Sequence, residues 1–74
     1  MDEMDFLRAF GKRLQQLRKS KELSYRKMST MCDIDYSDIS KIEKGQVNIQ
    51  LSTILELSKA LEVEPKEFFE FNKD

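Results

Sequence analysis

The sequence predicts an all-α fold, a five-helix bundle formed by one domain over residues 1–74. Apolar residues recur at helical spacings of three and four along most of the chain, whereas the alternation typical of strands is absent. Two glycines and one proline leave no room for a long linker. A domain of this length buries only about 60% of the surface of its unfolded chain, so we expect a thin core and no deep substrate cleft.

Three helices are expected before the first long polar loop. The first runs from about residue 4 to residue 20 and has one apolar face: Phe6, Phe10, Leu14 and Leu17. The second is expected over residues 24–32, because a serine, which is a favoured N-cap residue, opens it. The third is expected over residues 35–44, with Asp35 as its N-cap and Gly45 as the left-handed residue that terminates it.

Two further helices are expected after the polar loop at residues 46–50. The fourth is amphipathic, with one apolar face: Leu51, Ile54, Leu55, Ser58 and Leu61. Pro65 suits the first position of a short fifth helix. Three phenylalanines follow it and are difficult to bury together in so small a domain, which makes them candidate dimer contacts: Phe68, Phe69 and Phe71. The alternative is that they cap the open end of the bundle.

Charge is unevenly distributed along the chain, although its formal net value is only −1. Residues 8–27 hold one acid, Glu22, and eight basic residues, a local charge of +7: Arg8, Lys12, Arg13, Arg18, Lys19, Lys21, Arg26 and Lys27. The acids collect at residues 1–5 and 62–74. Because phosphate attraction depends on charges within about a Debye length, a basic face of this chain can bind nucleic acid. The alternative is that these are ordinary solvated helix charges.

The composition argues against an enzyme and against secretion. Histidine is absent, which removes the commonest general base and the commonest zinc ligand. The single cysteine, Cys32, cannot form an internal disulfide and fits a reducing compartment. The N-terminus is acidic where a secretory signal is basic, and no apolar run is long enough to span a membrane. We therefore expect a cytoplasmic protein with no cofactor, metal or small-molecule substrate.

The second and third expected helices indicate a DNA-binding unit. Only two or three residues are expected between them, and so short a connection makes two helices cross steeply, as in a helix-turn-helix. Several stretches match one family in the same register: Gly11-Lys12-Arg13-Leu14, Leu17-Arg18, Leu23-Ser24, Ile39-Ser40-Lys41-Ile42-Glu43-Lys44-Gly45 and Leu51 through Val63. On these stretches, residues 11–63 resemble the phage-repressor/Cro (XRE-like) helix-turn-helix family. The resemblance implies a lambda-repressor-like fold and a sequence-specific transcriptional regulator that binds double-stranded DNA.

The resemblance also implies roles for individual residues. Tyr36, Ser37 and Lys41 take the positions that read base edges in the major groove. Contacts to DNA phosphates fall to a second set: Ser24, Tyr25, Arg26, Lys44, Gln46 and Asn48. Arg18 and Glu43 take the positions of an ion pair that joins the first helix to the end of the third. The plain alternatives are that Tyr36 covers the core and that the charged residues are simply solvated.

The sequence departs from the family pattern at several positions. Tyr25 stands where glutamine is usual, and Glu22 and Glu62 replace glycines, so those helix ends are expected to be less sharply terminated. Asp33 replaces a turn glycine, which is tolerable because aspartate enters the left-handed region more easily than most residues. Asp38 favours the helix dipole near the start of the third helix but would repel a nearby phosphate.

We therefore expect a homodimer that places two third helices in successive major grooves of a near-palindromic operator. Arg26 is expected to strengthen binding to all sequences alike, and Lys41 to set the preference at one base position. Regulation would come from concentration or a protein partner, as for phage regulators, restriction–modification controllers or antitoxins. The alternative, motivated by Asp33, Asp35 and Asp38, is a protein-interaction module with the same fold that has lost DNA binding.

Overall fold

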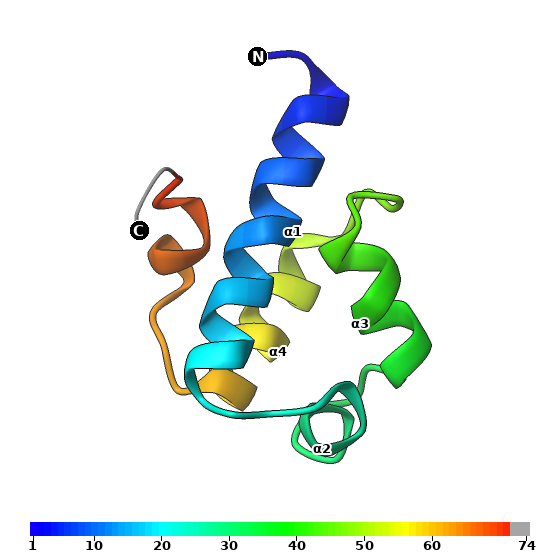
Figure 1. Cartoon of the computed structure of the whole chain (residues 1–74), viewed down its shortest axis with the longest axis vertical. Helices are drawn as coiled ribbons and strands as arrows, with labels where there is room; N and C mark the ends of the chain where they lie inside the picture. Colours follow the sequence, from blue (N-terminus) through cyan, green and yellow to red (C-terminus); the bar gives the residue numbers. More distant parts are fainter. Residues whose placement is uncertain (72–74) are drawn as a thin grey trace.

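The computed structural model describes residues 1–71, which form four α-helices and one 3-10 helix around a single core (Figure 1). In chain order these elements are α1 (Glu3–Ser20), α2 (Tyr25–Ser29), α3 (Tyr36–Glu43), α4 (Leu51–Leu61) and η1 (Pro65–Phe69). No strand occurs in this part of the chain, and none of its helices is long and apolar enough to cross a membrane. The all-α class expected from the sequence is confirmed.

α1 runs through the middle of the molecule and begins where a side-chain cap forms. The carboxylate of Asp2 accepts a hydrogen bond from the backbone N–H of Asp5 at 2.8 Å, which satisfies one of the free donors of the first turn. The first turn is acidic and the last turn is basic, with Arg18 and Lys19. Both charge distributions interact favourably with the helix dipole, so the terminal residues of α1 stabilise this helix.

The core receives at least one side chain from every element. The largest fully buried side chains are Leu14, Met28, Ile39, Leu57, Leu61 and Phe68. Burying an apolar side chain of this size stabilises a fold by about 1.5–3 kcal/mol relative to leaving it exposed. Because the short elements α2 and η1 each contribute one of these side chains, tertiary packing holds them in place where their own length could not.

α2 is shorter than predicted, and the turn after it is longer. The helix ends at Ser29 instead of Cys32, and six residues separate it from α3 in place of the expected two or three. The hydroxyl of Ser29 donates to the carbonyl oxygen of Arg26 at 2.8 Å, and that of Thr30 donates to the carbonyl oxygen of Lys27 at 2.6 Å. Such local bonds compete with continuation of the helix.

The predicted fifth helix is a 3-10 helix, so residues 1–71 contain four α-helices and not five. η1 begins at Pro65 as expected, and its single short turn takes the 3-10 form that is common in short connecting segments. Its Phe68 has no exposed surface and packs 5.4 Å, centroid to centroid, from the ring of Phe10. The prediction that Phe68 is a dimer contact is therefore wrong, because that ring belongs to the core of the single chain.

Two glycines allow α1 and the end of α3 to touch backbone to backbone. A Cβ on Gly11 would lie 2.5 Å from the carbonyl oxygen of Ile42 and would also meet that of Glu43. Gly45 takes a φ of +71° and terminates α3, as predicted. A Cβ there would lie 2.8 Å from Cγ of Arg8 in α1. A side chain at either position would push α3 away from α1.

Two other helix ends enter the left-handed region without a glycine. Glu22 has a φ of 58° and Glu62 a φ of 57°, so both ends are terminated sharply, contrary to expectation. For residues with a Cβ this conformation costs about 1–2 kcal/mol. Asp33 does not have a positive φ, so its expected use of the left-handed region is wrong.

Replacing Glu22 with glycine is expected to stabilise the protein by about 0.5–1 kcal/mol, because glycine adopts a positive φ without a Cβ clash. Urea unfolding followed by circular dichroism measures the change. Lys21→Gly is the matched control, since the neighbouring Lys21 is also exposed but has a φ of −91° and should lose stability when made flexible. If the two variants changed stability in the same direction, strain at Glu22 would be refuted.

Candidate nucleic-acid interface

α3 presents a polar face to solvent. Three of its side chains are buried: Ile39, Ile42 and Glu43. Ser37 and Lys41 lie one turn apart on the opposite side, where both are exposed, and Lys44 follows at the helix end. Figure 1 shows α3 at the right edge of the molecule with α2 below it.

The first turn of α3 holds two of the three predicted base-reading residues. Tyr36, its first residue, is 42% exposed. The hydroxyl of Ser37 donates to Oδ2 of Asp35 at 2.6 Å. Asp35 occupies the predicted N-cap position, but its carboxylate makes no cap bond, because it accepts from Ser37 instead. The third residue, Lys41, makes no ion pair within residues 1–71.

Asp38 is exposed and lies three residues before Lys41, so it neighbours Lys41 on the surface of α3. Together with Asp33 it borders a shallow groove of about 320 Å³ between α3 and the start of α4. The rest of that groove is lined mainly by apolar side chains: Ile34, Ile42, Val47, Ile49 and Thr53. Asp38 therefore borders both this groove and the exposed face of α3, and its expected repulsion of a nearby phosphate stays a prediction.

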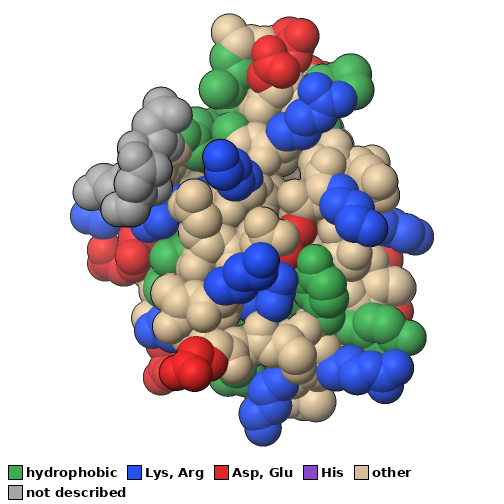
Figure 2. All heavy atoms as spheres, in the orientation of Figure 1, with side chains coloured by type: hydrophobic (Ala, Val, Ile, Leu, Met, Phe, Trp, Pro, Cys, Tyr) green, Lys and Arg blue, Asp and Glu red, His purple; other side chains and the backbone are tan. Residues whose placement is uncertain are grey.

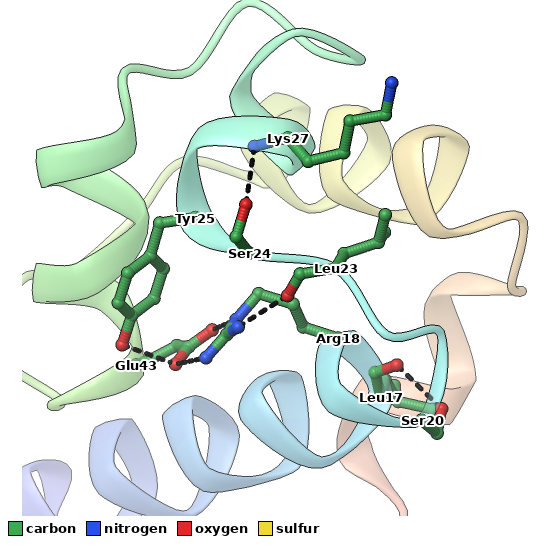
Figure 3. A network of polar contacts seen from close by, with 8 residues as sticks. All are labelled: Leu17, Arg18, Ser20, Leu23, Ser24, Tyr25, Lys27 and Glu43. Carbon is green, nitrogen blue, oxygen red and sulfur yellow. Dashed lines mark hydrogen bonds and ion pairs between the residues drawn. The ribbon is translucent and has the colours of Figure 1, made fainter.

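A buried ion pair holds α3 on its supporting helices (Figure 3). Arg18 in α1 donates from Nε to Oε2 of Glu43 at 2.6 Å and from Nη2 to Oε1 at 3.1 Å. Its Nη1 donates to the carbonyl oxygen of Leu23, 2.7 Å away, just before α2. The hydroxyl of Tyr25 in α2 donates to Oε1 of Glu43 at 3.0 Å. One carboxylate at the end of α3 therefore joins three helices.

The burial of this pair makes each partner depend on the other. The side chain of Glu43 has no exposed surface, and that of Arg18 is 8% exposed. The hydrogen bond to Glu43 raises the pKa of Arg18 above its usual value, and burial partly offsets this rise. Within residues 1–71, no buried side-chain nitrogen or oxygen lacks a hydrogen bond. A fully paired arrangement of this kind fixes orientation, whereas loss of one partner leaves a buried charge alone.

The same network changes the role expected for Tyr25. Its hydroxyl has a single hydrogen, which is donated to Glu43, and the guanidinium of Arg18 lies 4.2 Å from the centroid of its ring. In this arrangement the hydroxyl has no hydrogen left for a phosphate oxygen. The phosphate contact expected for Tyr25 at the start of α2 stays a prediction, and its side chain helps to orient α3.

The other phosphate candidates lie near both ends of the helix-turn-helix. Ser24 caps α2, with its Oγ accepting from the backbone N–H of Lys27 at 3.0 Å (Figure 3). Arg26 is exposed, and its guanidinium carbon lies 4.9 Å from the ring centroid of Tyr36. An exposed set follows at the end of α3 and in the loop beyond it: Lys44, Gln46 and Asn48.

Basic side chains spread over the face that includes α1, α2 and the edge of α3. Figure 2 shows them across this face, with visible acids mainly at its upper end and lower left. Two of the eight basic residues counted in the sequence serve the fold instead. Arg18 is buried, and Arg13 donates to the carbonyl oxygen of Glu67 at 2.8 Å and lies 3.6 Å from Glu70. The sequence count therefore overstates the charge available to a polyanion.

A second exposed surface is apolar, and we call it the apolar surface: Phe6, Leu51, Leu55 and Phe69. Leu51 is 84% exposed and Leu55 is 47% exposed, although both were expected on the buried face of their helix. Beside them, a mostly apolar groove of about 300 Å³ runs between α1, the start of α4 and η1. Phe71 is half-buried, with its ring 5.8 Å from that of Phe6. Sequence periodicity missed Leu51 and Leu55, because it cannot tell which side of an apolar stripe is covered.

Comparison with known proteins places this fold in a family. The family profile described as Helix-turn-helix matches residues 14–68. Control protein C.BamHI of Bacillus amyloliquefaciens is 41% identical over 63 residues, which cover 84% of this chain and 78% of that protein.

Two solved structures are similar over most of their length. The restriction-modification controller protein C.AhdI from Aeromonas hydrophila superposes with a TM-score of 0.83 and 41% identity, covering 85% of this chain and 96% of that one. The controller C.Esp1396I, solved as a tetramer with its natural 35 base-pair operator, superposes with a TM-score of 0.80 and 25% identity, covering 88% and 86%.

Tyr25→Phe should destabilise the protein by about 1 kcal/mol, because it removes one hydrogen bond from a buried carboxylate and leaves the ring beside Arg18. Arg18→Ala should cost about 3–5 kcal/mol, since it leaves Glu43 buried and unpaired. Both changes are measured by urea unfolding. Tyr36→Phe, at an exposed tyrosine, is the control and should stay within about 0.5 kcal/mol of the parent. Equal effects at Tyr25 and Tyr36 would show that the buried hydroxyl is unimportant.

Proposed function

This chain belongs to the helix-turn-helix family of DNA-binding transcriptional regulators, and we propose that it controls the genes of a restriction–modification system. Its similarity to C.BamHI and C.AhdI, at 41% identity each and over most of both chains, supports this assignment. The chain then acts in the cytoplasm, where the genes and the target DNA lie, and has no catalytic role of its own.

The exposed face of α3, held on a fixed scaffold, carries this proposal. The major groove is about 12 Å wide and admits one α-helix. Lys41 donates to the O6 and N7 edge of guanine, Ser37 contacts a neighbouring base, and the ring of Tyr36 packs on a thymine methyl group. Because Arg18 and Glu43 tie α3 to α1 before DNA arrives, little ordering of the helix is required on binding.

Phosphate contacts come from exposed residues on both sides of the reading face. Ser24 and Arg26 lie at the start of α2. A second group lies at the end of α3 and after it: Lys44, Gln46 and Asn48. These contacts set the register of the helix on the duplex and make the affinity fall as salt rises.

The functional unit is a homodimer formed through the apolar surface. Four large apolar side chains with exposed fractions from 40% to 84% are unfavourable in water unless a second chain covers them. A two-fold axis through this surface pairs the patch with the same patch of a second chain, as in an isologous interface. Phe69 and Phe71 keep the dimer role predicted for them, and Leu51 and Leu55 join it.

Duplex binding at two salt concentrations tests the proposal. Generic duplex DNA should bind weakly at about 50 mM salt and far more weakly at about 200 mM, because released counterions drive the association. Selection from a random duplex pool should then return a near-palindromic site with half-site centres about 34 Å apart. Failure to bind any duplex even at low salt would refute DNA binding and favour the protein-interaction module.

Lys41→Ala should relax the base preference at one position of the selected half-site by about five-fold to a hundred-fold, because one direct base contact is lost. Binding of the operator and of single-base-pair variants, compared by fluorescence anisotropy, measures the preference. Lys59→Ala is the control, since it removes the same charge from an exposed position on α4. If Lys41→Ala weakened binding to all operator variants by the same factor, Lys41 would be assigned to phosphate binding instead.

Leu51→Glu should weaken dimerisation at least ten-fold, because it places a carboxylate without a partner charge inside an apolar interface on each chain. The monomer should remain folded, since Leu51 is the first residue of α4 and a carboxylate there favours the helix dipole. Sedimentation equilibrium measures the dissociation constant. Met31→Glu, 44% exposed in the turn after α2, should leave it unchanged. Dimers of Leu51→Glu as tight as those of the parent would rule out this interface.

A further inference from the structure

We infer that Arg26 sets sequence preference as well as affinity, because it positions the base-reading ring of Tyr36. This inference rests on the function proposed above and adds a positioning residue to it. The sequence alone suggested that Arg26 binds a phosphate and acts on all DNA sequences alike.

The two side chains come from different helices and meet at their first turns. Arg26 is the second residue of α2, and Tyr36 is the first residue of α3. The guanidinium carbon lies 4.9 Å from the ring centroid, within the range of a cation–π contact. Both side chains are exposed, so the contact lies at the surface that faces DNA in the proposed complex.

The guanidinium of Arg26 keeps its hydrogen-bond donors free. Within residues 1–71 it forms neither an ion pair nor a hydrogen bond. Because the guanidinium contacts the ring of Tyr36 without donating any hydrogen bond to a protein acceptor, it retains N–H donors that match two oxygens of one phosphate. Arg26 can therefore bind the DNA backbone and hold the ring of Tyr36 at the same time.

This double contact links backbone position to base reading. The contact with Arg26 restricts the rotamers of Tyr36 before DNA binds, so less conformational entropy is lost when the ring enters the groove. It also sets the distance between the anchored phosphate and the base that the ring touches. Removing Arg26 should thus let the ring of Tyr36 change rotamer and should weaken the preference for the base that the ring contacts.

Lys27 provides a matched comparison. It follows Arg26 in the same turn of α2, is exposed, and carries the same charge. The described part of the chain gives it no aromatic partner, in contrast to Arg26. Loss of Lys27 should therefore remove a charge without affecting Tyr36.

The experiment uses the operator obtained by selection and its single-base-pair variants at the position that Tyr36→Ala relaxes. Dissociation constants are measured for the parent, Arg26→Ala, Arg26→Lys and Lys27→Ala. We expect Lys27→Ala to weaken all duplexes by one common factor. Arg26→Ala should in addition reduce the ratio between the affinities for preferred and disfavoured base pairs at that position by about two-fold to five-fold, the size of an exposed cation–π contact. Arg26→Lys keeps the positive charge, so the salt dependence of binding should stay the same. The ratio between preferred and disfavoured base pairs should fall, but by less than for Arg26→Ala.

A second measurement separates this effect from general damage. In a Tyr36→Ala background, the extra effect of Arg26→Ala on base preference should vanish, because the ring it positions is absent. If Arg26→Ala weakened binding to all duplexes by one common factor, as expected for Lys27→Ala, the inference would be overturned and the proposed function would stand. A parent protein that selects no operator would overturn both.

Discussion

The carboxylate of Glu43 is the point on which the arrangement of the reading helix depends. It is removed from solvent, it is paired with Arg18 of α1, and it accepts a hydrogen bond from Tyr25 of α2. A buried charge is tolerable only when its partners are in place, so the three helices must adopt the one relative orientation that supplies them. The close approach permitted by Gly11 brings the end of α3 within reach of this pair. The outward direction of Ser37 and Lys41 follows from that orientation.

Two arginine–tyrosine contacts involve α2, and they differ in depth. The inner contact, between Arg18 of α1 and Tyr25 of α2, belongs to the buried network that positions α3. The outer contact, between Arg26 of α2 and Tyr36 of α3, lies at the surface. Successive residues of α2, Tyr25 and Arg26, thus serve the scaffold and the surface respectively.

Charge and apolar area are distributed so that one small chain offers two different surfaces. The net charge of −1 hides a basic face, and part of the basic sequence is used internally by Arg13 and Arg18. The apolar surface lies elsewhere, on the first half of α1, α4 and η1. A domain of this size cannot cover every large apolar side chain by itself, and the remaining ones are then available to a second copy.

The sequence by itself determined the all-α class, the approximate starts of the four α-helices and the terminator Gly45, through short-range periodicity and local capping and turn chemistry. The pairing of Arg18 with Glu43, which lie 25 residues apart, came only from the resemblance to the helix-turn-helix family. Only the tertiary structure decided that Phe68 is buried while Leu51 is exposed, that the hydroxyl of Tyr25 is committed to Glu43, and that Arg26 lies over Tyr36. Each of these depends on which elements far apart in sequence come to lie against one another, and a one-dimensional pattern of apolar and polar residues contains no such information.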